Sequence, residues 1–154
     1  FIRPEGEDAM RVYNLDRDGA SKIELLVFAK GEEVMERLRQ YAADEGIAAA
    51  SFTGIGAFSS STVAFFDRAR RVYDPIPVDE QVELLNITGN ITLFEGAPRI
   101  HAHATLSRPD GSTIGGHLIA GTVWPTLELT LWRGTAEIVR ETDEESGLGL
   151  VGSE

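Results

Sequence analysis

The chain has 154 residues, of which 42% are hydrophobic, and this combination predicts one globular domain with a buried core. Its 14 basic and 25 acidic residues give a formal net charge of −11, which repels the phosphate backbone of nucleic acids. The absence of cysteine excludes disulfides, cysteine-based zinc sites and thiol nucleophiles.

Strand-like segments dominate the chain. Apolar runs and alternating patterns typical of strands occur at residues 10–15, 23–29, 47–52, 62–66, 82–94, 100–107, 114–119, 127–132 and 136–139. A turn is expected at 16–19, a flexible corner at 53–57, and a bulge at Gly89 within the longest strand. From Glu141 onward the chain is acidic, and we expect a solvated, partly ordered tail.

One amphipathic helix is expected to begin near Gly31 and to end at Gly46. Val34, Leu38 and Tyr41 recur at helical spacing, and charged side chains occupy the opposite face. One helix beside many strands that are joined by short turns predicts an α+β fold. Its sheet is expected to be largely antiparallel.

The sequence also bears on domain organisation and location. No stretch approaches the roughly 18 apolar residues of a membrane span, and no signal-peptide pattern is present, so we expect a cytoplasmic protein without membrane contact. No repeat or composition shift divides the chain. We therefore expect a single domain over residues 1–154, with a core at about 10–149 and an acidic C-terminal tail at 141–154.

All the histidines of the chain, His101, His103 and His117, lie in one region with the pattern of a hairpin. Side chains two apart on a strand leave the same face, so the first two histidines point together. The segment 108–112 has the chemistry of a three-residue hairpin loop, and counting outward from it places His103 opposite His117. The three imidazoles are then expected to converge, whereas a two-residue turn would send His117 to the other face.

Three convergent neutral imidazoles suit a divalent metal ion, with zinc as the first expectation and iron, nickel or copper as alternatives. The three histidines are therefore the predicted metal ligands, and water or a distant group such as Glu83 would complete the shell. An open water position would also suit a metal-dependent enzyme, for which Glu83, Asp67 and Asp110 are candidate acids or bases. The alternative is that the histidines are ordinary polar residues on a solvated sheet face.

Two further motifs have more than one interpretation. Residues 65–73 hold the only basic cluster, Arg68, Arg70 and Arg71, flanked by aromatic side chains. This cluster is either a small nucleic-acid patch or, as we favour, a charged surface loop that joins two strands.

The segment 54–56 has the glycine spacing that begins a dinucleotide fingerprint, but it lacks the third glycine and the following helix, which favours a tight strand connection.

Four segments follow one another in a specific order: Thr53–Ala57, Val82–Ile91, His101–His103 and Gly115–Leu118. Together they resemble the plants-and-prokaryotes conserved (PPC) domain family in its stand-alone prokaryotic form. The resemblance covers residues 10–149, nearly the whole chain. It implies an α+β domain with an antiparallel sheet, a homotrimer, and a shared site formed by the three histidines.

Three functional hypotheses follow. The first is a metal-binding protein that acts as a trimeric binding or regulatory module, with itself as partner and an unknown ligand. The second is the DNA-binding protein of the label often given to prokaryotic members. It is opposed by the net charge of −11 and by the lack of the Arg-Gly-Arg-Pro AT-hook that accompanies this domain in plants. The third is a metal-dependent enzyme that uses the three histidines with an open water position.

Overall fold

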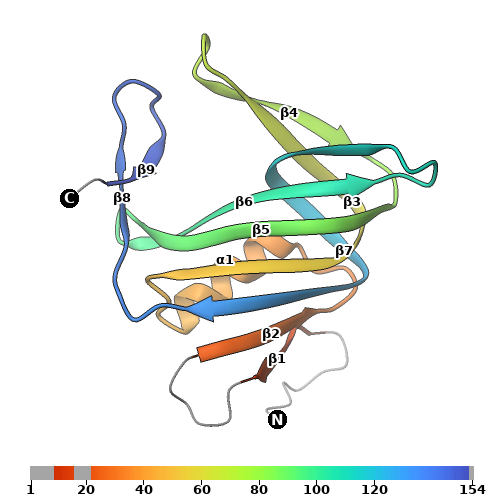
Figure 1. Ribbon diagram of the computed structural model, residues 1–154, viewed down its shortest axis with the longest axis horizontal. Coiled ribbons are helices and arrows are strands. Elements are labelled where there is room, and N and C mark those ends of the chain that lie inside the picture. The colour runs from red at the N-terminus through yellow and green to blue at the C-terminus, as the bar shows by residue number, and fades with distance from the viewer. Residues whose placement is uncertain (1–8, 16–21, 153–154) are drawn as a thin grey trace.

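The computed structural model describes residues 9–15 and 22–152, and this part of the chain is mostly β-sheet with one short helix (Figure 1). The elements in chain order are β1 (Arg11–Asn14), β2 (Lys22–Phe28), α1 (Val34–Asp44), β3 (Ala50–Asp67), β4 (Val72–Val78), β5 (Val82–Phe94), β6 (Ala97–Ser107), β7 (Thr113–Arg133), β8 (Val139–Thr142) and β9 (Gly149–Val151). No helix within these residues has the length and apolar character needed to cross a membrane.

The pairing of four long strands closes on itself. β3 pairs with β5, β5 with β6, β6 with β7, and β7 with β3, all of them antiparallel. The 21-residue β7 makes this possible, because its first part pairs with β6 and its last part with β2. The closure brings β6 beside the first part of β7, and these are the two strands that carry the histidines.

Helix α1 covers the apolar face of the sheet and lies behind it in Figure 1. Val34 and Leu38 are fully buried in the core, as their helical spacing predicts. The helix begins later than expected from Gly31, because the side chain of Glu33 caps it by accepting hydrogen bonds from two backbone amides of the first turn. Gly46, with a φ of 61°, follows its C-terminal end.

Two predictions about glycines were wrong. The segment 53–57 is no flexible corner but part of the 18-residue β3. Gly54 is needed there because a Cβ would lie 2.6 Å from a carbonyl oxygen of β7. Gly89 likewise forms no bulge: it pairs regularly with both neighbouring strands, and the register shift in β5 lies between Leu84 and Asn86.

The other differences concern strand ends and edges. The predicted strands 114–119 and 127–132 are parts of the single strand β7. β4 was not predicted because it contains Pro75 and Pro77, which are tolerated since, among the described strands, β4 pairs only with β3 and forms an edge. The acidic tail forms the β8–β9 hairpin, and β8 pairs with β5, so it is not merely a solvated end. The turn predicted at 16–19 lies outside the described residues.

Candidate metal centre

The β6–β7 hairpin has the register that the sequence predicts. The backbone N–H of Arg108 donates to the carbonyl of Ser112 over 2.9 Å, and Gly111 has the positive φ of 80° that the turn requires. His103 consequently lies directly opposite His117. The two glycines that precede His117 do not disturb this register, so the predicted pairing is confirmed.

The three imidazoles converge on the outer face of the sheet, away from the α1 side. One nitrogen from each of His101, His103 and His117 can be chosen so that all lie within 4.8 Å of one another. Their ring centroids are 5.2 to 5.8 Å apart. His101 and His117 are partly buried and His103 is exposed, so the cluster has one side open to solvent. This arrangement presents three nitrogen donors to a single point.

The neighbours of His117 hold its ring in place. Tyr73 of β4 stacks on this ring with centroids 4.4 Å apart. Gly116 allows β7 to approach β3, because a Cβ there would lie 2.6 Å from the carbonyl oxygen of Ala64. The Nδ1 atom of His117 is buried and makes no hydrogen bond with the described residues. A buried ring nitrogen without a partner is unusual, and a metal ion would supply the missing interaction.

The electrostatic environment keeps the partly buried imidazoles neutral. Burial, followed by the charges of His101, His103 and Arg99, lowers the pKa of His117 from 6.5 to about 4. Burial and then the charge of Arg140 also lower the pKa of His101. Neutral imidazole is the form that binds a metal ion, so the donor set fits a divalent metal of intermediate softness such as zinc.

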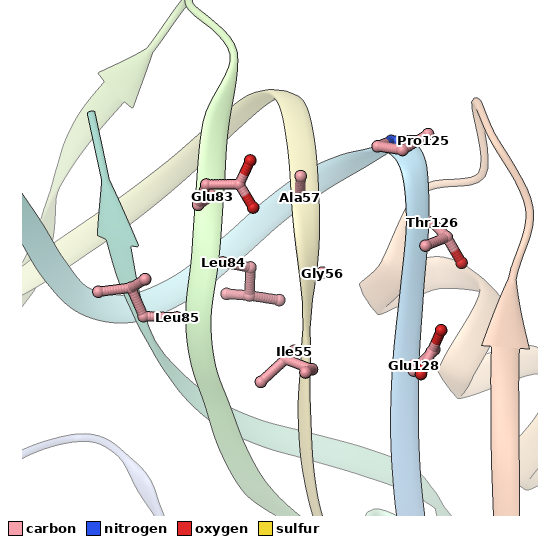
Figure 2. A pocket seen from close by; sticks show the side chains of 9 residues that line it. All are labelled: Ile55, Gly56, Ala57, Glu83, Leu84, Leu85, Pro125, Thr126 and Glu128. Carbon is pink, nitrogen blue, oxygen red and sulfur yellow. The ribbon is translucent and has the colours of Figure 1, made fainter. Parts of the chain in front are cut away.

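The carboxylates proposed as companions do not join the histidines. Glu83 lines a separate pocket together with Ile55 and Glu128, as Figure 2 shows. Asp67 pairs with an arginine at 2.8 Å in the β3–β4 turn, and Asp110 accepts a hydrogen bond from a backbone amide of its own turn at 2.9 Å. Among the described residues no acidic side chain belongs to the histidine cluster. Within one chain Glu83 therefore does not join the histidines, and of the two completions considered for the shell a water molecule is the one that this arrangement leaves open.

The basic cluster lies in the turn between β3 and β4, in agreement with the surface-loop interpretation. Its arginines are already partnered. Arg70 forms ion pairs with Asp67 and Asp74, and Arg68 forms one with Glu145 at 3.2 Å. Arg71 donates to a backbone carbonyl of the β8–β9 loop at 3.4 Å. The surrounding acids thus neutralise much of the charge that a nucleic acid would contact.

Two cations beside the histidines were missed by the sequence reasoning. Arg99 lies two residues before His101 and shares its face of β6. The alternation of side chains along a strand, which placed the histidines on one face, could therefore also have placed Arg99 there. Arg140 comes from β8 and is buried, with only 8% of its surface exposed. No spacing in the sequence connects it with the histidines, because β8 reaches them through its parallel pairing with β5.

Comparison with known proteins agrees with this architecture. A "Putative DNA-binding protein" from Ralstonia eutropha has 34% identity, covers 93% of this chain and 96% of its own, and has a TM-score of 0.83. A "Metal-containing Protein" from Archaeoglobus fulgidus has 28% identity over 86% of this chain and 94% of its own, with a TM-score of 0.81. A plant- and prokaryote-conserved protein from Pyrococcus horikoshii has 27% identity over 94% and 95%, and its TM-score is also 0.81.

No curated protein sequence matches the chain at a significant level. Residues 16–134 match the family described as the Plants and Prokaryotes Conserved (PCC) domain. This match covers more than half of the sequence, and it includes all three histidines and the strands that carry them. The chain therefore belongs to the plants-and-prokaryotes conserved domain family.

Proposed function

We propose that the protein is a metal-binding module that holds one divalent ion through His101, His103 and His117, with zinc as the first expectation. The observation that carries this proposal is the convergence of three imidazole nitrogens within 4.8 Å. The unpartnered Nδ1 of His117 and the metal content of the Archaeoglobus fulgidus relative support it. A bound ion would act as a Lewis acid that attracts an oxygen ligand. The chain itself would supply the nitrogen donors and hold their rings.

A competition titration against a chromophoric chelator tests the metal site. Wild-type protein is expected to bind one zinc ion per chain. Each of the variants His101→Ala, His103→Ala and His117→Ala is expected to weaken zinc binding by about 100-fold or more. Even the loss of a residue that only hydrogen-bonds a ligand lowers metal affinity by about 10- to 100-fold. Tyr73→Phe is the matched control, because it keeps the ring that stacks on His117. Equal affinity in all variants would contradict the proposal.

We propose further that the module assembles as a homotrimer, as the family resemblance implies. The support is a hollow of about 500 Å³ on the sheet, lined mostly by apolar residues beside Glu83 and Glu128 (Figure 2). Its Ile55 and Leu85 have 61% and 50% of their surfaces exposed. Exposed apolar side chains around one hollow are typical of an interface between proteins, and we assign a second copy of this chain to it.

Light scattering coupled to gel filtration tests the assembly. The expected mass is three times the 16.8 kDa of one chain. Leu85→Glu is expected to shift the mass toward that of the monomer, because it places a charge in an apolar interface. Leu15→Glu is the control, since Leu15 is similarly exposed, at 53%, but does not line the hollow. A monomeric wild type would contradict the proposal.

DNA binding is the second candidate, favoured by the description of relatives such as the Ralstonia eutropha protein. The net charge of −11 and the ion pairs of Arg68 and Arg70 oppose it. We expect no binding to duplex DNA at low salt. Affinity that falls steeply with salt, and that Arg70→Ala combined with Arg71→Ala abolishes, would instead support the DNA-binding role.

A further inference from the structure

Arg140 is a buried cation with no acidic partner among the described residues. Its guanidinium donates to the hydroxyl of Thr92 at 2.7 Å, the side-chain oxygen of Asn90 at 2.8 Å and the carbonyl of Gly149 at 2.9 Å. All three acceptors are neutral, and at least one of its five N–H donors remains available. A buried charge is normally paired, because it has lost the stabilisation that water provides. The pocket around Arg140 therefore has an unfilled preference for an anion.

Arg99 adds a second positive charge on the same side of the sheet. It is exposed on β6, and among the described residues its only specific contact is with the ring of Phe94, 5.8 Å from the ring centroid. Arg99 and Arg140 line the same cavity as two of the histidines, so this part of the molecule is locally positive in a chain that is acidic overall.

A small cavity joins these groups. It has a volume of about 80 Å³ and is lined by His101, His117, Arg99, Arg140 and Tyr73, with residues 148–150 of the β8–β9 hairpin as one wall. One water molecule needs roughly 10–15 Å³ of such space, so the cavity accepts a group of several heavy atoms. A carboxylate or phosphate group has this size, and its oxygens match the donor fork of a guanidinium.

We propose that this cavity binds a small oxyanionic molecule, whose carboxylate or phosphate group lies between the histidine cluster and the guanidiniums of Arg140 and Arg99. The inference rests on the proposed metal site for one of its contacts, since a bound ion would attract the same oxygens. The chain's charge of −11 repels a long polyanion at a distance, whereas a small anion needs to fit only the local positive cavity. This identifies the missing ligand of the module by its chemical class.

Isothermal titration calorimetry tests the proposal with two probes, malonate for carboxylates and methylphosphonate for phosphates, on zinc-loaded and on chelator-treated protein. We expect at least one probe to bind the zinc-loaded wild type and to bind at least tenfold more weakly to Arg140→Gln and to Arg99→Gln. Arg99 is exposed, so its variant stays informative even if Arg140→Gln loosens the hairpin that Arg140 holds. Arg39→Gln is the control, because it removes the same charge from an exposed position on α1, which packs on the other face of the sheet.

The outcomes separate this inference from the metal site. Zinc binding without binding of either probe, or equal probe binding by wild type and both arginine variants, overturns the anion site and leaves the metal site standing. Arginine-dependent probe binding by a protein that binds no zinc supports the anion site and overturns the metal site. Binding of malonate alone identifies a carboxylate ligand, and binding of methylphosphonate alone identifies a phosphate ligand.

Discussion

Acidification of the metal-free protein is expected to destabilise it through His117. The pKa of this imidazole falls from 6.5 to about 4 in the folded chain, because burial and the neighbouring positive charges disfavour its protonated form. The unfolded chain therefore binds more protons between these two values, and the free energy of unfolding decreases as the pH falls from 6.5 toward 4. Above pH 6.5 both states are neutral at this site and the contribution is fully present.

The pKa difference sets the size of this effect. A fall from 6.5 to about 4 corresponds to a ceiling of about 3 kcal/mol. Because the cluster has one side open to solvent, screening reduces this to about 1–2 kcal/mol. The assay is urea unfolding followed by tryptophan fluorescence, with chelator present, at pH 7.5 and pH 4.5. His117→Gln serves as the comparison, since it removes the titrating group and leaves the carboxylates unchanged.

The expected result is that the wild type loses about 1–2 kcal/mol more than His117→Gln between the two pH values. The difference between the proteins is the relevant quantity, because the carboxylates of both titrate alike. Identical pH dependence in wild type and His117→Gln would refute the reasoning, since it would show that this imidazole is not held neutral by its surroundings.

Two further substitutions test the packing of the sheet, one beside the histidines and one at the other end of β7. Gly116→Ala places a Cβ 2.6 Å from the carbonyl oxygen of Ala64, and it is expected to lower stability by about 1–3 kcal/mol in thermal unfolding and to weaken zinc binding. Gly134→Ala is the control, because its nearest contact is at 3.4 Å and the substitution is expected to be tolerated in the same assay. Glu24→Gln removes the carboxylate that pairs with the Arg133 side chain at 2.6 Å, and it is expected to lower the free energy of unfolding in urea by about 3 kcal/mol. A loss well below 1 kcal/mol would mean that the remaining partners satisfy Arg133.

The hairpin that carries the histidines could be predicted because its register depends on local chemistry alone. The turn ending at Gly111 fixes the pairing of its flanking strands, and strand alternation then decides which side chains share a face. The buried face of α1 could be predicted from apolar periodicity, and the antiparallel sheet from the many strands joined by short turns.

The rest depended on contacts between distant parts of the chain. Gly54 and Gly89 were interpreted as a corner and a bulge, but both lie within strands where another strand's backbone or side chains approach closely, and the register shift of β3 lies between Gly54 and Gly56. Single-sequence patterns do not distinguish these two uses of glycine. Arg140 lies between the strand predicted at 136–139 and the acidic tail predicted from Glu141, so neither prediction included it. It reaches the histidines because the tail folds back as a hairpin on β5, which is a tertiary contact.

The central claim is that the three histidines bind one metal ion in each chain. The most direct test is elemental mass spectrometry of untagged protein, purified without chelator, beside His117→Ala and the Tyr73→Phe control. We predict about one equivalent of a divalent metal per chain in wild type and in Tyr73→Phe, and its loss in His117→Ala. Absence of metal from the wild type, even after incubation with zinc, iron, nickel or copper, would contradict the claim and leave the histidines as packing or subunit contacts.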